Sequence, residues 1–168
     1  MGLFLKDINL KGKTALITGA TKGLGRGAAI ALAQAGANVI AIGRNQNELN
    51  TLEKIIKKLK VKYESINCDV NDYYKIKTYI SNLRNLDILV NNAGTNIPEP
   101  FLNVKNSSLE TILNVNTKAV FNVAQLCANQ MIKLKKKGGS IINISSIFGL
   151  VAGQNRTVYS MTKFGVEG

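Results

Sequence analysis

Three side chains in the last quarter of the chain have types and a spacing that could move a proton to or from a carbonyl oxygen. Tyr159 and Lys163 are four residues apart, so they share a face if the segment is helical. A free phenol has a pKa of about 10, but a neighbouring ammonium group stabilises the phenolate and lowers that pKa. Ser146, thirteen residues before Tyr159, could polarise the carbonyl group. Tyr-x-x-x-Lys also arises by chance on helices, so it gains weight only with the rest of the chain.

A glycine-rich segment near the start of the chain could hold the pyrophosphate of a dinucleotide. It runs from Thr18 to Gly25 and joins an apolar, strand-like run to a helix-like stretch. Gly19 would permit the tight turn, Gly23 would let the backbone approach a pyrophosphate, and Gly25 would let the helix pack closely on the strand. The N–H groups and the dipole of the following helix favour an anion here. A simple glycine-rich turn is the alternative interpretation.

The residues after the second strand-like run indicate which nicotinamide cofactor is preferred. An acidic residue at this point would accept hydrogen bonds from the ribose hydroxyls of NAD(H). Here Gly43 and Arg44 follow the run, and Lys22 adds a second positive charge beside the glycine turn. A guanidinium group suits a 2′-phosphate through charge-assisted, bidentate hydrogen bonds. The sequence therefore favours NADP(H) over NAD(H), with a solvated arginine at a helix start as the alternative interpretation of Arg44.

Composition limits the chemistry further. The chain has 168 residues, 45% of them hydrophobic, which suits one globular domain over residues 1–168 with a sizeable core. It has no histidine, which excludes Ser-His-Asp and Cys-His catalysis and every histidine-containing metal site. Cys68 and Cys127 form neither a disulfide framework nor a zinc site, so we expect both to be reduced and partly buried, and we expect no metal.

A net charge of +12, from 22 basic against 10 acidic residues, could indicate nucleic-acid binding. However, the densest basic run, Lys133 to Lys137, falls in an expected last helical turn, where it complements the helix dipole, and no aromatic platform accompanies the charges. We therefore expect a lysine-rich surface and no nucleic-acid partner. No apolar run is long enough to span a membrane, and residues 1–10 lack a secretory signal, so we expect a cytoplasmic protein with no membrane partner.

Apolar runs alternate with stretches of helical periodicity along the chain. This alternation predicts a doubly wound α/β fold, in which helices cover both faces of a parallel sheet. A capping box formed by Ser107 and Glu110 predicts a helix start, and a long helix is expected from Thr117 to Lys136. The last helical pattern stops at Gly168 before it is complete, so we expect a piece of a longer protein. The expected strands are residues 14–18, 38–42, 63–67, 87–90 and 140–144.

In combination, the motifs resemble those of the short-chain dehydrogenase/reductase family, and the resemblance runs from about Asp7 to Gly168. It implies a Rossmann fold with a parallel sheet in the strand order 3-2-1-4-5, from which the last strands of the family are missing. It also implies an oxidoreductase that transfers a hydride between NAD(P)(H) and a carbonyl or secondary alcohol. The motifs are Thr18-Gly19-x-x-x-Gly23-x-Gly25, Asn91-Asn92-Ala93-Gly94, Ser146 and Tyr159-x-x-x-Lys163.

The resemblance implies a role for each matching residue. Tyr159 would be the general acid in reduction, and Ser146 would hold the substrate oxygen. Asn116 would support a proton-relay water near Lys163, and Asp69 would contact the adenine. The cofactor-binding residues implied in this way are Gly19, Thr21, Lys22, Gly23, Leu24, Gly25, Arg44, Asp69, Val70, Asn92, Ala93, Gly94, Tyr159 and Lys163.

The substrate is indicated only by finer similarity. The segment from Asn91 to Phe101 and the start Leu3-Phe4-Leu5 look similar to gluconate 5-dehydrogenase-like members, which implies a sugar acid such as gluconate. Arg156 could then meet the carboxylate. A 3-oxoacyl-carrier-protein reductase is the close alternative, because a basic surface suits an acidic carrier. A non-catalytic dinucleotide-binding module is the alternative of another class. The family also implies a homodimer or homotetramer for the full-length protein.

Overall fold

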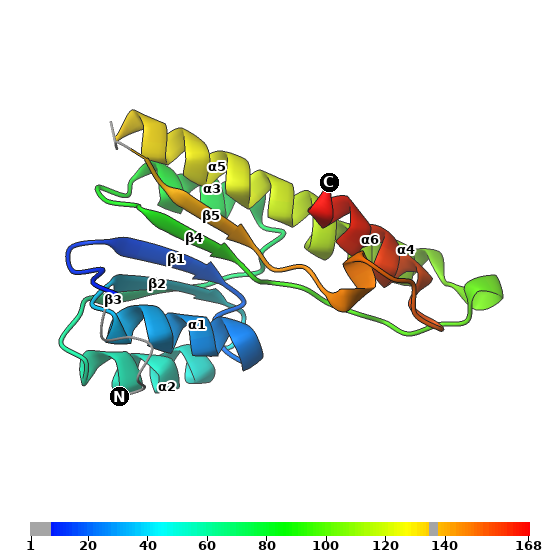
Figure 1. Ribbon diagram of the computed structural model, residues 1–168, viewed down its shortest axis with the longest axis horizontal. Helices are drawn as coiled ribbons and strands as arrows, with labels where there is room; N and C mark the ends of the chain where they lie inside the picture. Colours follow the sequence, from blue (N-terminus) through cyan, green and yellow to red (C-terminus); the bar gives the residue numbers. More distant parts are fainter. Residues whose placement is uncertain (1–7, 135–137) are drawn as a thin grey trace.

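The structure, a computed structural model, describes residues 8–134 and 138–168. Its centre is a five-stranded parallel sheet in the order β3-β2-β1-β4-β5 (Figure 1). The predicted parallel α/β fold and its strand order are therefore confirmed. The strands are β1 (Thr14–Thr18), β2 (Asn38–Gly43), β3 (Tyr63–Asn67), β4 (Ile88–Asn91) and β5 (Ser140–Asn143).

Strand β1 occupies the middle of the sheet because its residues can be buried on both faces. All five of them are buried. Successive side chains point to opposite faces, so that Ala15 and Ile17 join one core cluster and Leu16 joins the other. A continuous apolar run is what such doubly covered strands require.

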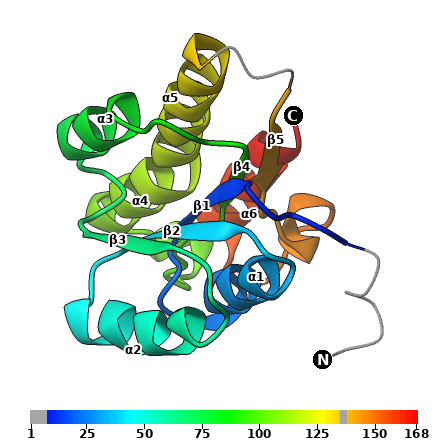
Figure 2. The ribbon, with the colours of Figure 1, turned by 90° about the vertical axis from the view of Figure 1, so that its left-hand side faces the viewer.

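Helices cover both faces of the sheet (Figure 2). On one face, α1 and α2 pack through small and branched side chains, and Leu49, Leu52 and Ile56 of α2 recur at helical spacing. On the other face, α3 and α5 supply the apolar side chains. The bounds are α1 (Gly23–Gln34), α2 (Gln46–Lys57), α3 (Tyr73–Ser81), α4 (Asn106–Leu113), α5 (Ala119–Lys133) and α6 (Thr157–Glu167).

Helices α4 and α6 extend the molecule past the carboxyl ends of the strands (Figure 1). Helix α6 packs against α4 and against η4 (Ile147–Gly149), a short 3-10 helix that follows β5. Ligands of open parallel sheets bind outside the carboxyl ends of the strands. The fold therefore places α6 beside the edge of the sheet where a ligand is expected.

The predicted capping box was wrong. Helix α4 begins at Asn106, its N-cap is Lys105, and no side chain in the described part of the chain caps it. Ser107 lies inside the first turn, where its carbonyl accepts the hydroxyl of Thr111, so it is past the position from which a serine can cap.

The long helix predicted from Thr117 to Lys136 also needs correction at its start. It is preceded by η3 (Asn114–Lys118), a π-helical turn in which the N–H of Ala119 bonds to the carbonyl of Asn114, five residues back. Helix α5 ends at Lys133. Leu134 is its C-cap, so the predicted helix was too long by at least this residue. Residues 135 and 136 of the predicted helix, and most of the basic run from Lys133 to Lys137, lie outside the described residues, as does the segment Leu3-Phe4-Leu5.

In residues 8–134 and 138–168 no helix is both long enough and apolar enough to cross a membrane. The same residues hold no cluster of histidine, cysteine or acidic side chains suited to a metal. Cys68 and Cys127 are free, as expected, and both are buried more fully than expected; burial raises the pKa of the Cys127 thiol to about 12.

Candidate active site

The glycine turn between β1 and α1 has a backbone geometry suited to holding a pyrophosphate, the role predicted for it. Gly19 and Gly23 have φ angles of 62° and 50°, in the left-handed region that glycine adopts without strain. A Cβ atom on Gly25 would collide with the carbonyl oxygen of Gly19 and the side-chain amide of Asn92, so only glycine lets α1 approach this closely. A Cβ atom on Gly23 would meet nothing within 4 Å, so this part of the backbone is open to a ligand.

The start of α1 is suited to an anion. Lys22 is its N-cap, and no side chain of the described residues caps the helix at this end. The N–H groups of the first turn and the helix dipole therefore present positive potential beside the open backbone of Gly23.

Hydrogen bonds tie the glycine turn to the end of β4. The side-chain amide of Asn92 donates to the carbonyls of Thr18 and Gly19, at 3.0 and 3.2 Å. The hydroxyl oxygen of Thr18 accepts the N–H groups of Asn92 and Ala93, both at 3.0 Å. Asn92 thus acts as a structural residue of the turn. The Thr18 hydroxyl was missed, although its place at the end of β1 and the start of the glycine motif could have indicated it.

A crevice opens at the carboxyl ends of β1, β2 and β4. Seven of the predicted cofactor residues line it, whereas Lys22, Gly23 and Gly25 belong to the neighbouring turn. The lining residues are Gly19, Thr21, Ile42, Arg44, Cys68, Asp69, Val70, Ala93, Gly94, Thr95, Thr111 and Val115.

A second hollow adjoins this crevice, because Gly94 and Thr95 line both. It brings the predicted pair Tyr159 and Lys163 to the same place as three other predicted cofactor residues, Leu24, Asn92 and Gly94. A ligand that filled both hollows would run from Arg44 past Gly94 to Tyr159. The hollow is lined by Leu24, Asn92, Gly94, Thr95, Asn96, Ile144, Ser145, Tyr159 and Lys163.

Tyr159 and Lys163 lie on the same face of α6. The Lys163 ammonium is 5.7 Å from the centre of the Tyr159 ring, and Lys163 is only 4% exposed. The ammonium donates a hydrogen bond of 2.7 Å to the carbonyl of Ile144, which directly follows β5. Burial lowers the pKa of Lys163. A Cβ atom on Gly94 would stand 3.8 Å from the ammonium, so the glycine keeps this approach uncrowded.

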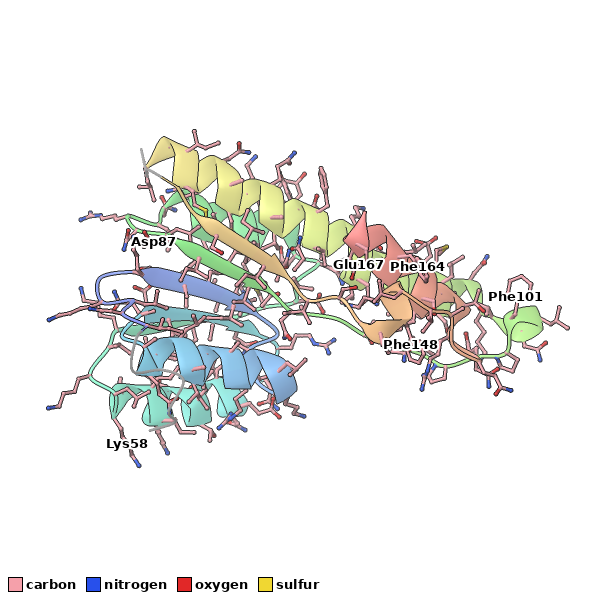
Figure 3. The ribbon with its side chains drawn as sticks, viewed as in Figure 1. Lys58, Asp87, Phe101, Phe148, Phe164 and Glu167 are labelled. Carbon is pink, nitrogen blue, oxygen red and sulfur yellow. The ribbon has the colours of Figure 1, made fainter. Side chains whose placement is uncertain are left out.

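The two serines after β5 differ in their surroundings. Ser145 lines the second hollow, and its hydroxyl donates to the carbonyl of Lys163 at 3.4 Å. Ser146 is not among the lining residues; its Oγ accepts the N–H of Phe148 at 3.2 Å and so caps η4. Figure 3 shows Phe148 where η4 meets α6, and its ring packs edge-on against Tyr159, with centroids 6.2 Å apart. The predicted role of Ser146 stays a prediction.

Asn116 lies in the π-helical turn η3 and is fully buried. Its Oδ1 accepts the N–H of Thr95 at 2.8 Å, and its Nδ2 donates to the carbonyl of Thr95 at 2.9 Å and to the hydroxyl of Thr162 at 3.2 Å. The Thr162 hydroxyl in turn donates to the carbonyl of Tyr159 at 2.7 Å. Asn116 therefore holds the loop after β4 against α6. Thr95 and Thr162 were missed, and their only sequence signal is that each adjoins a motif.

The two cations expected to meet a 2′-phosphate are each paired with a carboxylate. The Arg44 guanidinium is 3.6 Å from the carboxylate of Asp69, and both residues line the crevice. The Lys22 ammonium is 2.9 Å from the carboxylate of Glu48. Glu48 was missed, because nothing in the glycine motif indicates that α2 contacts it.

Comparison with known proteins identifies the family. The profile for short chain dehydrogenase matches residues 13–168. The chain is 38% identical over 157 residues to L-xylulose reductase of Mus musculus, covering 94% of this chain and 62% of that protein. It is 36% identical over 165 residues to 3-oxoacyl-[acyl-carrier-protein] reductase of Thermotoga maritima, covering 96% of this chain and 66% of that protein. The chain belongs to the short-chain dehydrogenase family.

A solved structure from Beutenbergia cavernae, described as an NAD(P)-dependent gluconate 5-dehydrogenase with bound NADP at low occupancy, superposes with a TM-score of 0.87 and 29% identity. It matches 95% of this chain and 64% of its own chain. The present chain thus spans somewhat less than two thirds of the length of the mouse and Beutenbergia proteins.

Replacement of Gly25 by alanine should destabilise the fold at the glycine turn. The new methyl group would overlap the Gly19 carbonyl and the Asn92 amide, so we expect the free energy of unfolding to fall by about 1–3 kcal/mol in urea titrations. Gly27→Ala is the matched control on the same helix, because its Cβ atom would meet nothing within 4 Å; a gain of about 0.4–1 kcal/mol is expected there. Equal effects of the two substitutions would contradict this account.

The burial of Lys163 should make stability depend on pH. Its pKa in the folded chain lies below the ordinary value of 10.5, so between those two values the unfolded chain binds more protons. Stability contributed by this residue is therefore lowest below the folded pKa and rises with pH until 10.5. The free energy of unfolding of the wild type minus that of Lys163→Met should accordingly increase as the pH rises from neutral. A difference that fell over this range would contradict the assignment.

Proposed function

We propose that the chain forms the dinucleotide-binding domain of an NADP(H)-dependent oxidoreductase, which transfers a hydride between the nicotinamide and a carbonyl or secondary alcohol. The observation that carries this proposal is that the crevice beside Arg44 shares Gly94 and Thr95 with the hollow beside Tyr159 and Lys163. An elongated cofactor with adenosine at one end and a reactive ring at the other matches that layout.

The residues at the glycine turn fit such a cofactor. The open backbone at Gly23 and the uncapped start of α1 suit its pyrophosphate. The missing side chain at Gly94 leaves room beside the Lys163 ammonium. The bound dinucleotide would supply or accept the hydride. The protein would position the dinucleotide and would donate or accept the proton.

Tyr159 is proposed to move that proton. In reduction the carbonyl carbon gains the hydride and the carbonyl oxygen gains the proton of the Tyr159 hydroxyl; in oxidation both transfers reverse. The Lys163 ammonium, 5.7 Å from the ring centre, stabilises the negative charge left on the phenol oxygen. Ser146 would hold the substrate oxygen, since a hydroxyl that accepts the Phe148 N–H still has its own proton to donate.

NADP(H) is proposed over NAD(H) from the end of β2. Gly43 offers no carboxylate to the ribose hydroxyls, and Arg44 lines the crevice directly after it. The Beutenbergia structure, described with bound NADP, supports the same preference. NAD(H) is the second candidate, because both nearby cations already have carboxylate partners.

A sugar acid such as gluconate is the proposed substrate, and a 3-oxoacyl-carrier-protein is the alternative. The first is supported by the Beutenbergia relative and by Arg156, the N-cap of α6, which could meet a carboxylate. The second is supported by the Thermotoga relative and by the net charge of +12. Parallel assays of gluconate with NADP⁺ and of a 3-oxoacyl-carrier-protein with NADPH distinguish the two.

A homodimer or homotetramer remains our proposal for the full-length protein. Val123 and Cys127 of α5 are buried in the core of the chain itself and are not available for a subunit contact. Phe121 of the same helix is 64% exposed and is the better candidate for a subunit contact.

Tyr159→Phe tests the proposed function. The substitution removes the proton donor and keeps the ring that packs on Phe148, so we expect turnover by the full-length protein to fall at least about 100-fold while NADPH binding is retained. Tyr79→Phe is the control, because that hydroxyl donates to Glu64 on the outer strand, away from the two hollows, and its loss should leave turnover unchanged. Full turnover by Tyr159→Phe would favour a different catalytic group, and cofactor binding without any wild-type turnover would favour the non-catalytic module.

A further inference from the structure

Glu48, an acidic residue of α2, forms an ion pair with Lys22, the cation of the glycine turn. The carboxylate of Glu48 is 2.9 Å from the Lys22 ammonium. The Lys22 side chain is 79% exposed, whereas that of Glu48 is 25% exposed. The carboxylate is thus the better fixed partner, and the lysine reaches across to it.

The first turn of α2 holds Glu48 in place and in its charged form. The side chain of Asn45 caps the helix by accepting the N–H of Glu48 at 3.2 Å, and a carboxylate in the first turn is favoured by the helix dipole. The hydrogen bond from Lys22 lowers the pKa of Glu48, with smaller contributions from Thr21 and Arg26. The negative charge is therefore present at neutral pH.

This charge lies next to the adenosine end of the proposed cofactor site. Thr21 lines the crevice and contacts the Glu48 side chain. It also lies directly beside Gly43, where a Cβ atom on the glycine would collide with the Thr21 methyl group. Gly43 directly precedes Arg44, the residue expected to meet a 2′-phosphate. A phosphate held between Arg44 and Lys22 would accordingly stand close to the Glu48 carboxylate.

We propose that Glu48 is a specificity-determining residue, which weakens the binding of a 2′-phosphorylated nucleotide and lets the protein accept NADH beside NADPH. The inference rests on the proposed function. A 2′-phosphate that took Lys22 from Glu48 would leave this carboxylate unpaired and close to a second anion, which opposes binding. NADH, with neutral ribose hydroxyls, leaves the Lys22–Glu48 pair intact.

Glu48 fits this role better than Asp69, the other acidic residue nearby. Asp69 is 3.6 Å from Arg44, and the two side chains are 42% and 80% exposed, so solvent screens this pair and the arginine can turn toward a phosphate. Asp69 was also predicted to contact the adenine, a role that both cofactors share. The Lys22–Glu48 contact, by contrast, would have to open for a 2′-phosphate to take Lys22.

Glu48→Gln removes the charge and keeps the size and the backbone N–H that Asn45 caps. We expect the dissociation constant of NADPH, measured by cofactor fluorescence with the full-length protein at low salt, to fall about fivefold, since one unit charge near a doubly charged phosphate is removed. The dissociation constant of NADH should change by less than about twofold, because its ribose carries no charge. The NADPH effect should shrink in high salt.

Glu53→Gln is the matched control. It removes an equal charge from the same helix, where the carboxylate pairs with Lys57 at 2.8 Å, one turn away, and it should change neither constant. Equal shifts for both cofactors in Glu48→Gln would overturn the inference, as would weaker NADPH binding, which would mean that Glu48 steadies Lys22 for the phosphate. If the wild type bound neither cofactor, the proposed function itself would be wrong and this inference would fall with it.

Discussion

Close backbone approach at the glycine turn is the constraint on which the rest of the site depends. Because Gly25 has no side chain, α1 can lie directly against the Gly19 carbonyl and the Asn92 amide. Thr18 then uses its hydroxyl oxygen to accept the N–H groups of Asn92 and Ala93. The same contacts that shape the turn therefore fix where the chain leaves β4. They also fix Gly94 and Thr95, the two residues that line both hollows.

Asn116 connects the loop after β4 to α6 by hydrogen bonds. A buried amide must satisfy its hydrogen bonds, and the π-helical turn places this one where Thr95 and Thr162 can do so. Thr162 is bonded to the carbonyl of Tyr159, so the segment that carries the phenol is held relative to the loop after β4. Lys163 completes the arrangement by donating to the carbonyl of Ile144. The proposed chemistry thus depends on a set of polar contacts inside the chain.

The sheet, the glycine turn and the shared face of Tyr159 and Lys163 could be predicted because their signals are local. Continuous apolar runs, left-handed glycines and a spacing of four are all read within a few residues. The bonds from Asn116 join residues 21 and 46 positions apart, and no local pattern contains them. The pairing of Lys22 with Glu48 likewise depends on how the glycine turn packs against α2. The positions of charged residues in the sequence therefore could not predict that Glu48 is the partner of Lys22.

The most direct test of the central claim is a crystal structure of the full-length protein with NADP⁺. The account predicts the pyrophosphate beside the backbone of Gly23 at the start of α1, and the nicotinamide ring in the hollow lined by Gly94 and Tyr159, with the phenol hydroxyl facing it. A nucleotide bound elsewhere, or a phenol hydroxyl turned away from the ring with the Lys163 ammonium remote from both, would contradict the account.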